Sequence, residues 1–118
     1  MKVFINDIRI YAHHGVMPQE QSIGGEFLAS IEAEFPNPIA IKTDDLSDTI
    51  NYVDITEIVQ TEMTIPSKLL EHAAGRIAQK ILSRFPSITM VTVRLIKRNP
   101  PLGVACKGAG VEITLQNK

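Results

Sequence analysis

The chain has 118 residues, of which 44% are hydrophobic and 21% are charged, and its formal net charge at pH 7 is −1. This balance predicts one soluble globular domain over residues 1–118, and the lack of a Lys/Arg cluster argues against binding to nucleic acid or to an anionic membrane. The single cysteine, Cys106, excludes an internal disulfide, and no apolar run approaches the roughly 20 residues of a membrane-spanning helix. Because the start also lacks the long apolar core of a signal peptide, we expect a cytoplasmic protein.

Two strands are predicted in the first third of the chain. Residues 26–35 show a period of two, with the apolar side chains of one face at Phe27, Ala29, Ile31, Ala33 and Phe35. In residues 3–15 the apolar parity changes between the pair Val3 and Ile5 and the pair Ile8 and Ile10. A bulge or turn at Asn6-Asp7 would explain this change.

The middle of the chain predicts two helices. Residues 39–53 are polar and irregular, after which Asp54 and Glu57 resemble a capping box that opens the first helix. Pro66 ends this helix, and Ser67 is a suitable N-cap for a second helix that stops before Pro86. The apolar residues of the second helix recur at helical spacing: Leu70, Ala73, Ala74, Ile77, Ala78, Ile81 and Leu82.

Two further strands follow, at about residues 88–98 and at residues 108–116, so the order of elements is ββααββ. This order predicts an α+β fold, in which a four-stranded, mainly antiparallel sheet carries two helices on one face. Such a sheet has two open edges, which must be blunted or paired with another subunit. For that reason we expect an oligomer.

Lys97 lies in the stretch VTVRLIKRNPP (91–101), on the strand parity of the apolar residues Val93 and Leu95. An ammonium group without a partner is costly to bury. The ordinary interpretation is therefore a lysine at a strand end, whose stem covers apolar surface while its head reaches water. The alternative is a lysine at the rim of a pocket, where it would act as a base or as a Schiff-base nucleophile.

Three further side chains are candidates for a binding site. Glu71 lies near the start of the second helix, where the helix dipole favours a carboxylate. A carboxylate facing a cleft would also match two parallel N–H donors, such as the guanidine-like edge of a pterin or guanine. Glu20 lies in a glycine-rich connection and Tyr52 at the end of a polar loop, and each alone is typical of a solvated surface.

His13 and His14 lack the spacing of a metal site, so turn packing is the simpler interpretation. The chain has no phosphate-binding loop, no dinucleotide fingerprint and no nucleophile elbow.

Taken together, the motifs resemble those of the dihydroneopterin aldolases, enzymes of folate biosynthesis. The resemblance extends over about residues 2–116 and rests on HGV at 14–16, Glu20, GGEF at 24–27, DTINYVD at 48–54, LLEHAAGRIA at 69–78 and IKRNPP at 96–101. It implies the tunnelling fold, in which four subunits join their sheet edges into a barrel. It also implies that two such rings commonly stack into an octamer, with active sites between adjacent subunits.

The resemblance implies roles for five residues. Glu71 matches the carboxylate that anchors the amino-pyrimidinone edge of the pterin, and Leu70 beside it matches a backbone contact. Glu20 matches a loop carboxylate with a catalytic or orienting role. Tyr52 matches a tyrosine that reaches in from a neighbouring subunit and takes part in proton transfer. Lys97 matches a lysine that acts as acid and base together with a bound water.

The implied reaction is the retro-aldol cleavage of 7,8-dihydroneopterin into 6-hydroxymethyl-7,8-dihydropterin and glycolaldehyde. The C6=N5 imine of the substrate accepts the electrons, so the resemblance implies no metal, no cofactor and no Schiff base. Reversal of the cleavage with the other face presented would give 2′-epimerisation as a second activity.

The chain departs from the family at Gly24-Gly25, where members often have Gly-Gln, and at Cys106 and Lys107. These departures bear on the balance of aldolase and epimerase activity. One alternative function is an epimerase of a phosphorylated dihydroneopterin, with Arg98 and Lys107 as candidate phosphate contacts. The others are a non-catalytic small-molecule-binding or assembly module and a Schiff-base aldolase.

Overall fold

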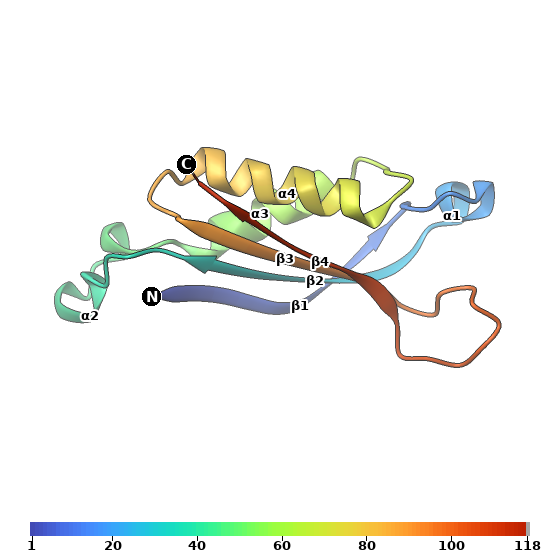
Figure 1. The fold of residues 1–118 in the computed structure, drawn as a ribbon, viewed down its shortest axis with the longest axis horizontal. Coiled ribbons are helices and arrows are strands. Elements are labelled where there is room, and N and C mark those ends of the chain that lie inside the picture. Colours follow the sequence, from blue (N-terminus) through green and yellow to red (C-terminus); the bar gives the residue numbers. More distant parts are fainter. Residues whose placement is uncertain (118) are drawn as a thin grey trace.

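The computed structural model describes residues 1–117. Its strands form one antiparallel sheet in the order β1-β2-β3-β4, and the helices α3 and α4 pack on one face of it (Figure 1). These elements are β1 (Lys2–Ala12), β2 (Gly25–Glu34), α3 (Tyr52–Met63), α4 (Leu70–Arg84), β3 (Met90–Lys97) and β4 (Ala109–Gln116). The predicted α+β fold with the order ββααββ is confirmed, and β1 and β4 are the two edge strands.

A β-bulge in β1 keeps the apolar side chains on the face that the helices cover. Ile5 pairs with Ile31 and Ile8 pairs with Ala29, so that two residues of β1, Asn6 and Asp7, lie opposite one residue of β2. Asp7 adopts a φ of 55°, and its N–H donates to Ser30 Oγ at 2.9 Å. The bulge predicted from the change of parity is therefore confirmed, and it places Ile5 and Ile8 on the same face.

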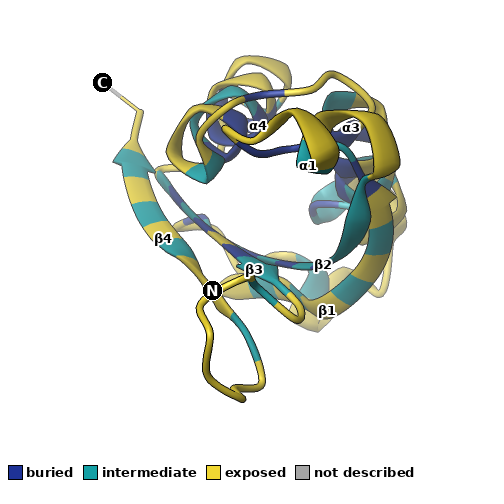
Figure 2. Ribbon diagram, turned by 90° about the vertical axis from the view of Figure 1, so that its right-hand side faces the viewer, coloured by how far each residue is buried: buried dark blue, intermediate teal, exposed yellow. Residues whose placement is uncertain are grey.

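The core lies between the sheet and the two helices, as the buried residues in Figure 2 show. From the sheet, the side chains of Phe27, Ala29, Ile31, Val91, Val93 and Leu95 are almost fully buried. Small residues on α4, such as Ala74 and Ala78, let the helix approach these strands closely. The larger side chains of Ile77 and Ile81 are also completely buried, and burial of such a side chain contributes about 1.5–3 kcal/mol each.

Both long helices begin at residues other than those predicted. Asn51, not Asp54, caps α3, because Asn51 Oδ1 accepts the Val53 N–H at 3.0 Å. Asp54 instead forms an ion pair with Arg84 at 3.7 Å. The residue before α4 is Leu69, which provides no side-chain cap, and Ser67 is buried two positions earlier.

Three short elements lie in segments for which no helix or strand was predicted. The helix α1 (Pro18–Ile23) lies in the connection between β1 and β2, and it begins with a proline, which is favoured in the first helical turn. The helix α2 (Ala40–Thr43) and the 3₁₀ helix η1 (Leu46–Asp48) precede α3. Figure 1 shows α1 and α2 at opposite ends of the sheet.

The two ends of the sheet are named here after the ends of β3. The Lys97 end comprises Ile10, Phe27, Lys97 and Ala109, which lie beside one another across the four strands. The Met90 end comprises Lys2, Glu34, Met90 and Gln116.

Candidate active site

Lys97 and Glu20 form an ion pair at the Lys97 end of the sheet. Lys97 Nζ donates a hydrogen bond to Glu20 Oε2, and 20% of each side chain is exposed, so both groups remain accessible from solvent. This hydrogen bond, with a second one from the Met17 N–H, holds the pKa of Glu20 below its usual value. The Glu20 carboxylate is therefore ionised at neutral pH and lies beside a cation.

The direction of the Lys97 side chain follows from the strand register. Lys97 pairs with Phe27, whose side chain is buried under the helices, so both side chains leave the sheet on its helical face. The ammonium lies 5.8 Å from the centroid of the Phe27 ring, within the range of a cation–π interaction. Thus the lysine that strand parity placed on the apolar face finds a carboxylate and an aromatic ring there.

The helix α1 presents Glu20, and Gly15 makes room for it. Glu20 Oε1 accepts the Met17 N–H at 3.2 Å, so the carboxylate closes the first turn of α1 while its other oxygen meets Lys97. A Cβ atom at position 15 would lie 2.5 Å from Glu20 Cβ and 2.7 Å from Glu20 Oε1. Only glycine leaves space for the carboxylate at this position. By contrast, a Cβ at Gly25 would meet nothing within 4 Å, so a side chain larger than glycine has room at this position.

His14 lies behind the ion pair as a buried neutral imidazole. Its side chain is only 1% exposed, and its ring meets the Phe27 ring edge to face, with 5.4 Å between the centroids. Nδ1 accepts the Ser67 N–H at 3.0 Å, so the neutral ring carries its proton on Nε2. Burial, aided by the positive charges of Arg76 and Lys97, lowers the pKa of His14 to about 4.

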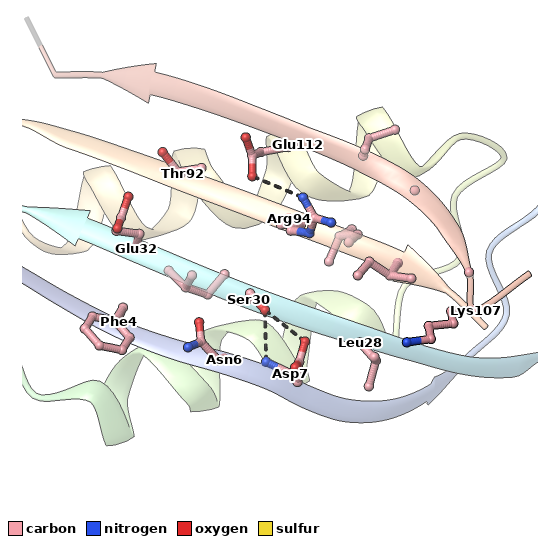
Figure 3. A pocket seen from close by; sticks show the side chains of 16 residues that line it. Phe4, Asn6, Asp7, Leu28, Ser30, Glu32, Thr92, Arg94, Lys107 and Glu112 are labelled. Carbon is pink, nitrogen blue, oxygen red and sulfur yellow. Dashed lines mark hydrogen bonds and ion pairs between the residues drawn. The ribbon is translucent and has the colours of Figure 1, made fainter.

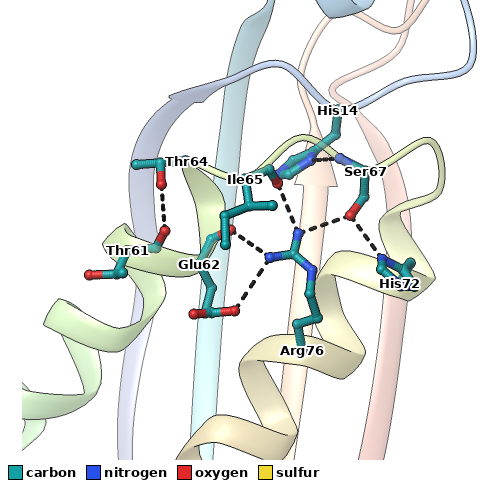
Figure 4. A network of polar contacts seen from close by, with 8 residues as sticks. All are labelled: His14, Thr61, Glu62, Thr64, Ile65, Ser67, His72 and Arg76. Atoms are coloured by element: carbon teal, nitrogen blue, oxygen red, sulfur yellow. Dashed lines mark hydrogen bonds and ion pairs between the residues drawn. The ribbon is translucent and has the colours of Figure 1, made fainter.

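Ser67 joins His14 to a polar network under the start of α4 (Figure 4). Ser67 Oγ accepts a hydrogen bond from Arg76 Nη2 at 2.9 Å and lies 3.0 Å from His72 Nδ1. Arg76 also donates to the backbone oxygens of Glu62 and Ile65 and forms an ion pair with the Glu62 carboxylate at 3.3 Å.

This network was not predicted from the sequence. Ser67 was expected to cap a helix, and His14 was expected only to pack in a turn. No sequence spacing joins residues as distant as His14, Ser67 and Arg76, and the HGV motif was the one local signal.

Leu70 and Glu71 form the first turn of α4, next to this network. Glu71 is exposed and Leu70 is half-buried. The first N–H groups of a helix have no partner within the helix, so a ligand at this point can meet backbone donors beside the Glu71 carboxylate. The Ser67–His14 hydrogen bond brings the start of α4 to the Lys97 end of the sheet, the end that also carries Glu20.

Tyr52 lies at the other end of the molecule. It is the first residue of α3, and the Asp54–Arg84 ion pair joins the start of α3 to the end of α4. Because α3 has 12 residues, its two ends are separated by about 18 Å. The Tyr52 side chain is 59% exposed. One chain therefore brings together Glu20, Lys97 and the start of α4, and it does not bring Tyr52 to them.

A broad groove on the helix-free face of the sheet holds none of the predicted site residues (Figure 3). It is lined by polar side chains such as Ser30, Thr92 and Arg94, with Lys107 at one end. Arg98, the other candidate phosphate contact, forms an ion pair with Glu26 at 2.6 Å. Glu26 directly precedes Phe27 in β2, and the Phe27 side chain points to the helical face, so the Glu26 side chain points to the opposite, helix-free face. Neither cation joins the Lys97–Glu20 pair.

Within residues 1–117, no helix is long and apolar enough to cross a membrane. In the same part of the chain, no group of three or more His, Cys, Asp or Glu side chains is arranged to hold a metal ion. The two adjacent histidines have separate partners, because His13 Nδ1 lies 3.0 Å from the Gln21 carbonyl oxygen. Cys106 is exposed.

Comparison with known proteins places the whole chain in one family. The family model for dihydroneopterin aldolase matches residues 3–114. The chain is 36% identical to the dihydroneopterin aldolase of Staphylococcus epidermidis, over 98% of this chain and 96% of that protein. It is 37% identical to the dihydroneopterin aldolase of Bacillus subtilis, over 96% and 95% of the two chains.

The crystal structure of E. coli dihydroneopterin aldolase in complex with neopterin is also similar. It superimposes with a TM-score of 0.89 at 30% sequence identity, covering 98% of each chain. The subunit fold that the motifs implied, a four-stranded antiparallel sheet with helices on one face, is thereby confirmed. The family match and the near-complete coverage of these relatives show that the chain belongs to the dihydroneopterin aldolase family.

Proposed function

We propose that the Lys97 end of the sheet carries out the retro-aldol cleavage of 7,8-dihydroneopterin, the aldehyde-lyase reaction of folate biosynthesis that gives the family its name. The observation that carries this assignment is the Lys97–Glu20 ion pair at the rim of the core. It provides a proton donor and an ionised acceptor side by side, both accessible from solvent. A reaction that removes one proton and returns another needs such a pair.

In the proposed mechanism, Lys97 acts through a bound water and Glu20 orients the reacting side chain of the substrate. The proton of the 2′-hydroxyl is removed, and the C1′–C2′ bond breaks to release glycolaldehyde. The electron pair of that bond passes into the C6=N5 imine. Return of a proton to C1′ then gives 6-hydroxymethyl-7,8-dihydropterin, so no covalent bond to the lysine is required.

The start of α4 is proposed to hold the pterin ring. The Glu71 carboxylate offers two oxygens to the two parallel N–H donors of the amino-pyrimidinone edge. The backbone at Leu70 adds a contact where the helix N–H groups lack partners. The E. coli relative was crystallised with neopterin, which carries the same edge. The pterin ring would then lie at the start of α4, and the reacting side chain of the substrate would extend from there to the Lys97–Glu20 pair.

We further propose that Tyr52 serves the site of a neighbouring subunit, where it takes part in proton transfer. Its exposure at the far end of α3 supports this assignment, because the residue cannot serve the Lys97 end of its own chain. The edge strands β1 and β4 are free to pair between subunits. Four chains of this single domain would form a ring and two rings an octamer, in a cytoplasmic enzyme that uses a small pterin and neither nucleic acid nor membrane.

A subunit-mixing experiment tests the shared site. Tyr52→Phe and Lys97→Ala variants are each expected to have low turnover. When the two are unfolded together and reassembled, some interfaces would combine an intact Tyr52 with an intact Lys97. Recovery of activity toward a quarter of the wild-type value is expected. A mixture no more active than its two components would exclude a site shared between subunits.

The roles of Lys97 and Glu71 are separated by comparing turnover with binding. Lys97→Ala should lower kcat by more than about 100-fold with little change in the Kd for neopterin, because it removes an interaction made in the reaction. Glu71→Ala should mainly abolish binding. Equal loss of binding in both variants would contradict the assignment. Failure of borohydride to trap substrate on Lys97 would exclude the Schiff-base alternative.

Epimerisation at C2′ is proposed as a side activity of the same site. Re-addition of glycolaldehyde to the other face of the enzyme-bound intermediate would yield the monapterin isomer. A preference for phosphorylated substrate is not favoured, since Arg98 is paired with Glu26 and Lys107 lies at the groove on the helix-free face. A comparison of turnover for phosphorylated and unphosphorylated dihydroneopterin decides which of the two substrates the enzyme prefers.

A further inference from the structure

We propose that the His14–Ser67 hydrogen bond is a positioning device that holds the Glu20–Lys97 pair in register with the pterin-binding start of α4. The effect on catalysis rests on the proposed function. The positioning itself is inferred from the geometry of His14, Gly15 and Ser67. None of these three residues contacts the reacting atoms in the mechanism above. Their role is to fix the distance between two halves of one site.

Ser67 is the point where the two halves meet, because all its polar groups are engaged. Its N–H donates to His14 Nδ1 at 3.0 Å, and its carbonyl oxygen accepts the Gly15 N–H at 2.9 Å. On the other side, its hydroxyl lies between Arg76 and His72 of α4. A single buried serine therefore connects the segment after β1 to the first turns of α4.

The segment after β1 controls where Glu20 lies. The carbonyl oxygen of Gly15 accepts a hydrogen bond from Gln21 Nε2 at 3.0 Å, which ties it to α1. The missing Cβ of Gly15 is what lets the Glu20 side chain pass. Movement of Gly15 would therefore carry both α1 and its carboxylate with it.

His14 suits this task because its ring can only accept from Ser67. Its neutral form has one acceptor nitrogen, Nδ1, and that nitrogen already holds the Ser67 N–H. The ring is fixed against Phe27, over which the Lys97 ammonium also lies. One aromatic side chain thus contacts both the positioning histidine and the proposed acid–base lysine. A misplacement of about 1 Å at such a site can lower turnover about 100-fold.

Two variants of matched shape test the proposal. In His14→Asn the side-chain oxygen replaces Nδ1 as acceptor, whereas His14→Leu has the same branching and no acceptor. The expected result is a kcat for H14N within a few-fold of the wild type and a loss of about 100-fold for H14L, with the Kd for neopterin changed much less. Equal kcat values for the two variants would overturn the proposal.

A double-mutant cycle distinguishes positioning from a general loss of structure. If His14 acts through Glu20, the factor lost on His14→Leu should shrink strongly in a Glu20→Gln background. Additive losses would mean that the histidine only stabilises the fold and would refute the inference. If H14L does not fold, His14→Gln replaces it, because its acceptor lies one bond farther out and should shift the same contact.

A titration independent of catalysis separates this inference from the proposed function. The pKa of the Glu20 carboxyl group, followed by carbon-13 NMR in selectively labelled protein, is expected to lie below its ordinary value in the wild type and in H14N. It should return toward the ordinary value in H14L. A value unchanged in H14L would contradict the positioning role, whereas a wild-type protein without aldolase activity would contradict only the proposed function.

Discussion

Acidification is predicted to destabilise this protein through His14. The unfolded chain binds a proton on this histidine near its ordinary pKa of 6.5, whereas the folded chain does so only near about 4. Between these values the unfolded state binds more protons, so stability is full above about pH 6.5 and falls as the pH is lowered toward 4. Protonation of Nδ1 would also place a second donor against the Ser67 N–H.

The magnitude follows from the separation of the two pKa values. One pKa unit corresponds to about 1.4 kcal/mol, so a shift of this size makes the free energy of unfolding about 2 kcal/mol lower near pH 5 than near pH 7. Glu20, Glu26 and Asp45 also have lowered pKa values. Their contributions are lost only as the pH falls further, through the carboxyl range.

Urea denaturation at several pH values, at fixed protein concentration, measures this effect. The His14→Asn variant is the matched comparison, because it keeps an acceptor for Ser67 and cannot be protonated in this range. The wild type should lose about 2 kcal/mol over the interval and the variant should lose little. An equal pH dependence in both proteins would show that His14 is not the titrating group and would refute the reasoning.

Three further predictions concern single contacts. Arg76→Met should lower the free energy of unfolding by about 3 kcal/mol in urea denaturation, because it leaves the half-buried Glu62 carboxylate and two backbone carbonyl oxygens without this donor. Arg84→Met, at an exposed ion pair, should lower it by less than about 1 kcal/mol. Similar losses in the two variants would contradict this. Gly15→Ala should displace Glu20 and reduce kcat about 10- to 100-fold in steady-state assays, and an unchanged kcat would disprove the steric argument. Asn51→Ala should lower the free energy of unfolding by about 1 kcal/mol through loss of the α3 cap, and a neutral result would show that the cap is dispensable.

The fold could be predicted because its signals are local and periodic. The period of two in β2 and the helical spacing in α4 each specify one buried face, and the change of parity in β1 located the bulge at Asn6-Asp7. The helix starts were predicted less well. Several capping residues lie close together in the sequence, and tertiary contacts decide among them. Asp54 forms an ion pair with Arg84, and Ser67 belongs to the buried polar network. The residues at the helix starts are instead Asn51 for α3 and Leu69 for α4.

The site could be predicted only in part, for a similar reason. Strand parity gave the inward direction of Lys97, and register with Phe27 explains it. Glu20, the partner of Lys97, lies 77 positions away in the sequence, and no local sequence pattern predicts a pair at that separation. His14, Ser67 and Arg76 are likewise brought together by tertiary structure alone. The assignment of Tyr52 to a neighbouring subunit came from the family motif, and it remains a prediction.

The central claim is that this chain cleaves 7,8-dihydroneopterin at the Lys97–Glu20 pair. The most direct test is product analysis by liquid chromatography after incubation of the purified oligomer with that substrate, with Lys97→Ala run in parallel. The wild type should give equal amounts of 6-hydroxymethyl-7,8-dihydropterin and glycolaldehyde, and the variant should give almost none of either. Absence of glycolaldehyde from the wild type, or equal product from both proteins, would contradict the central claim.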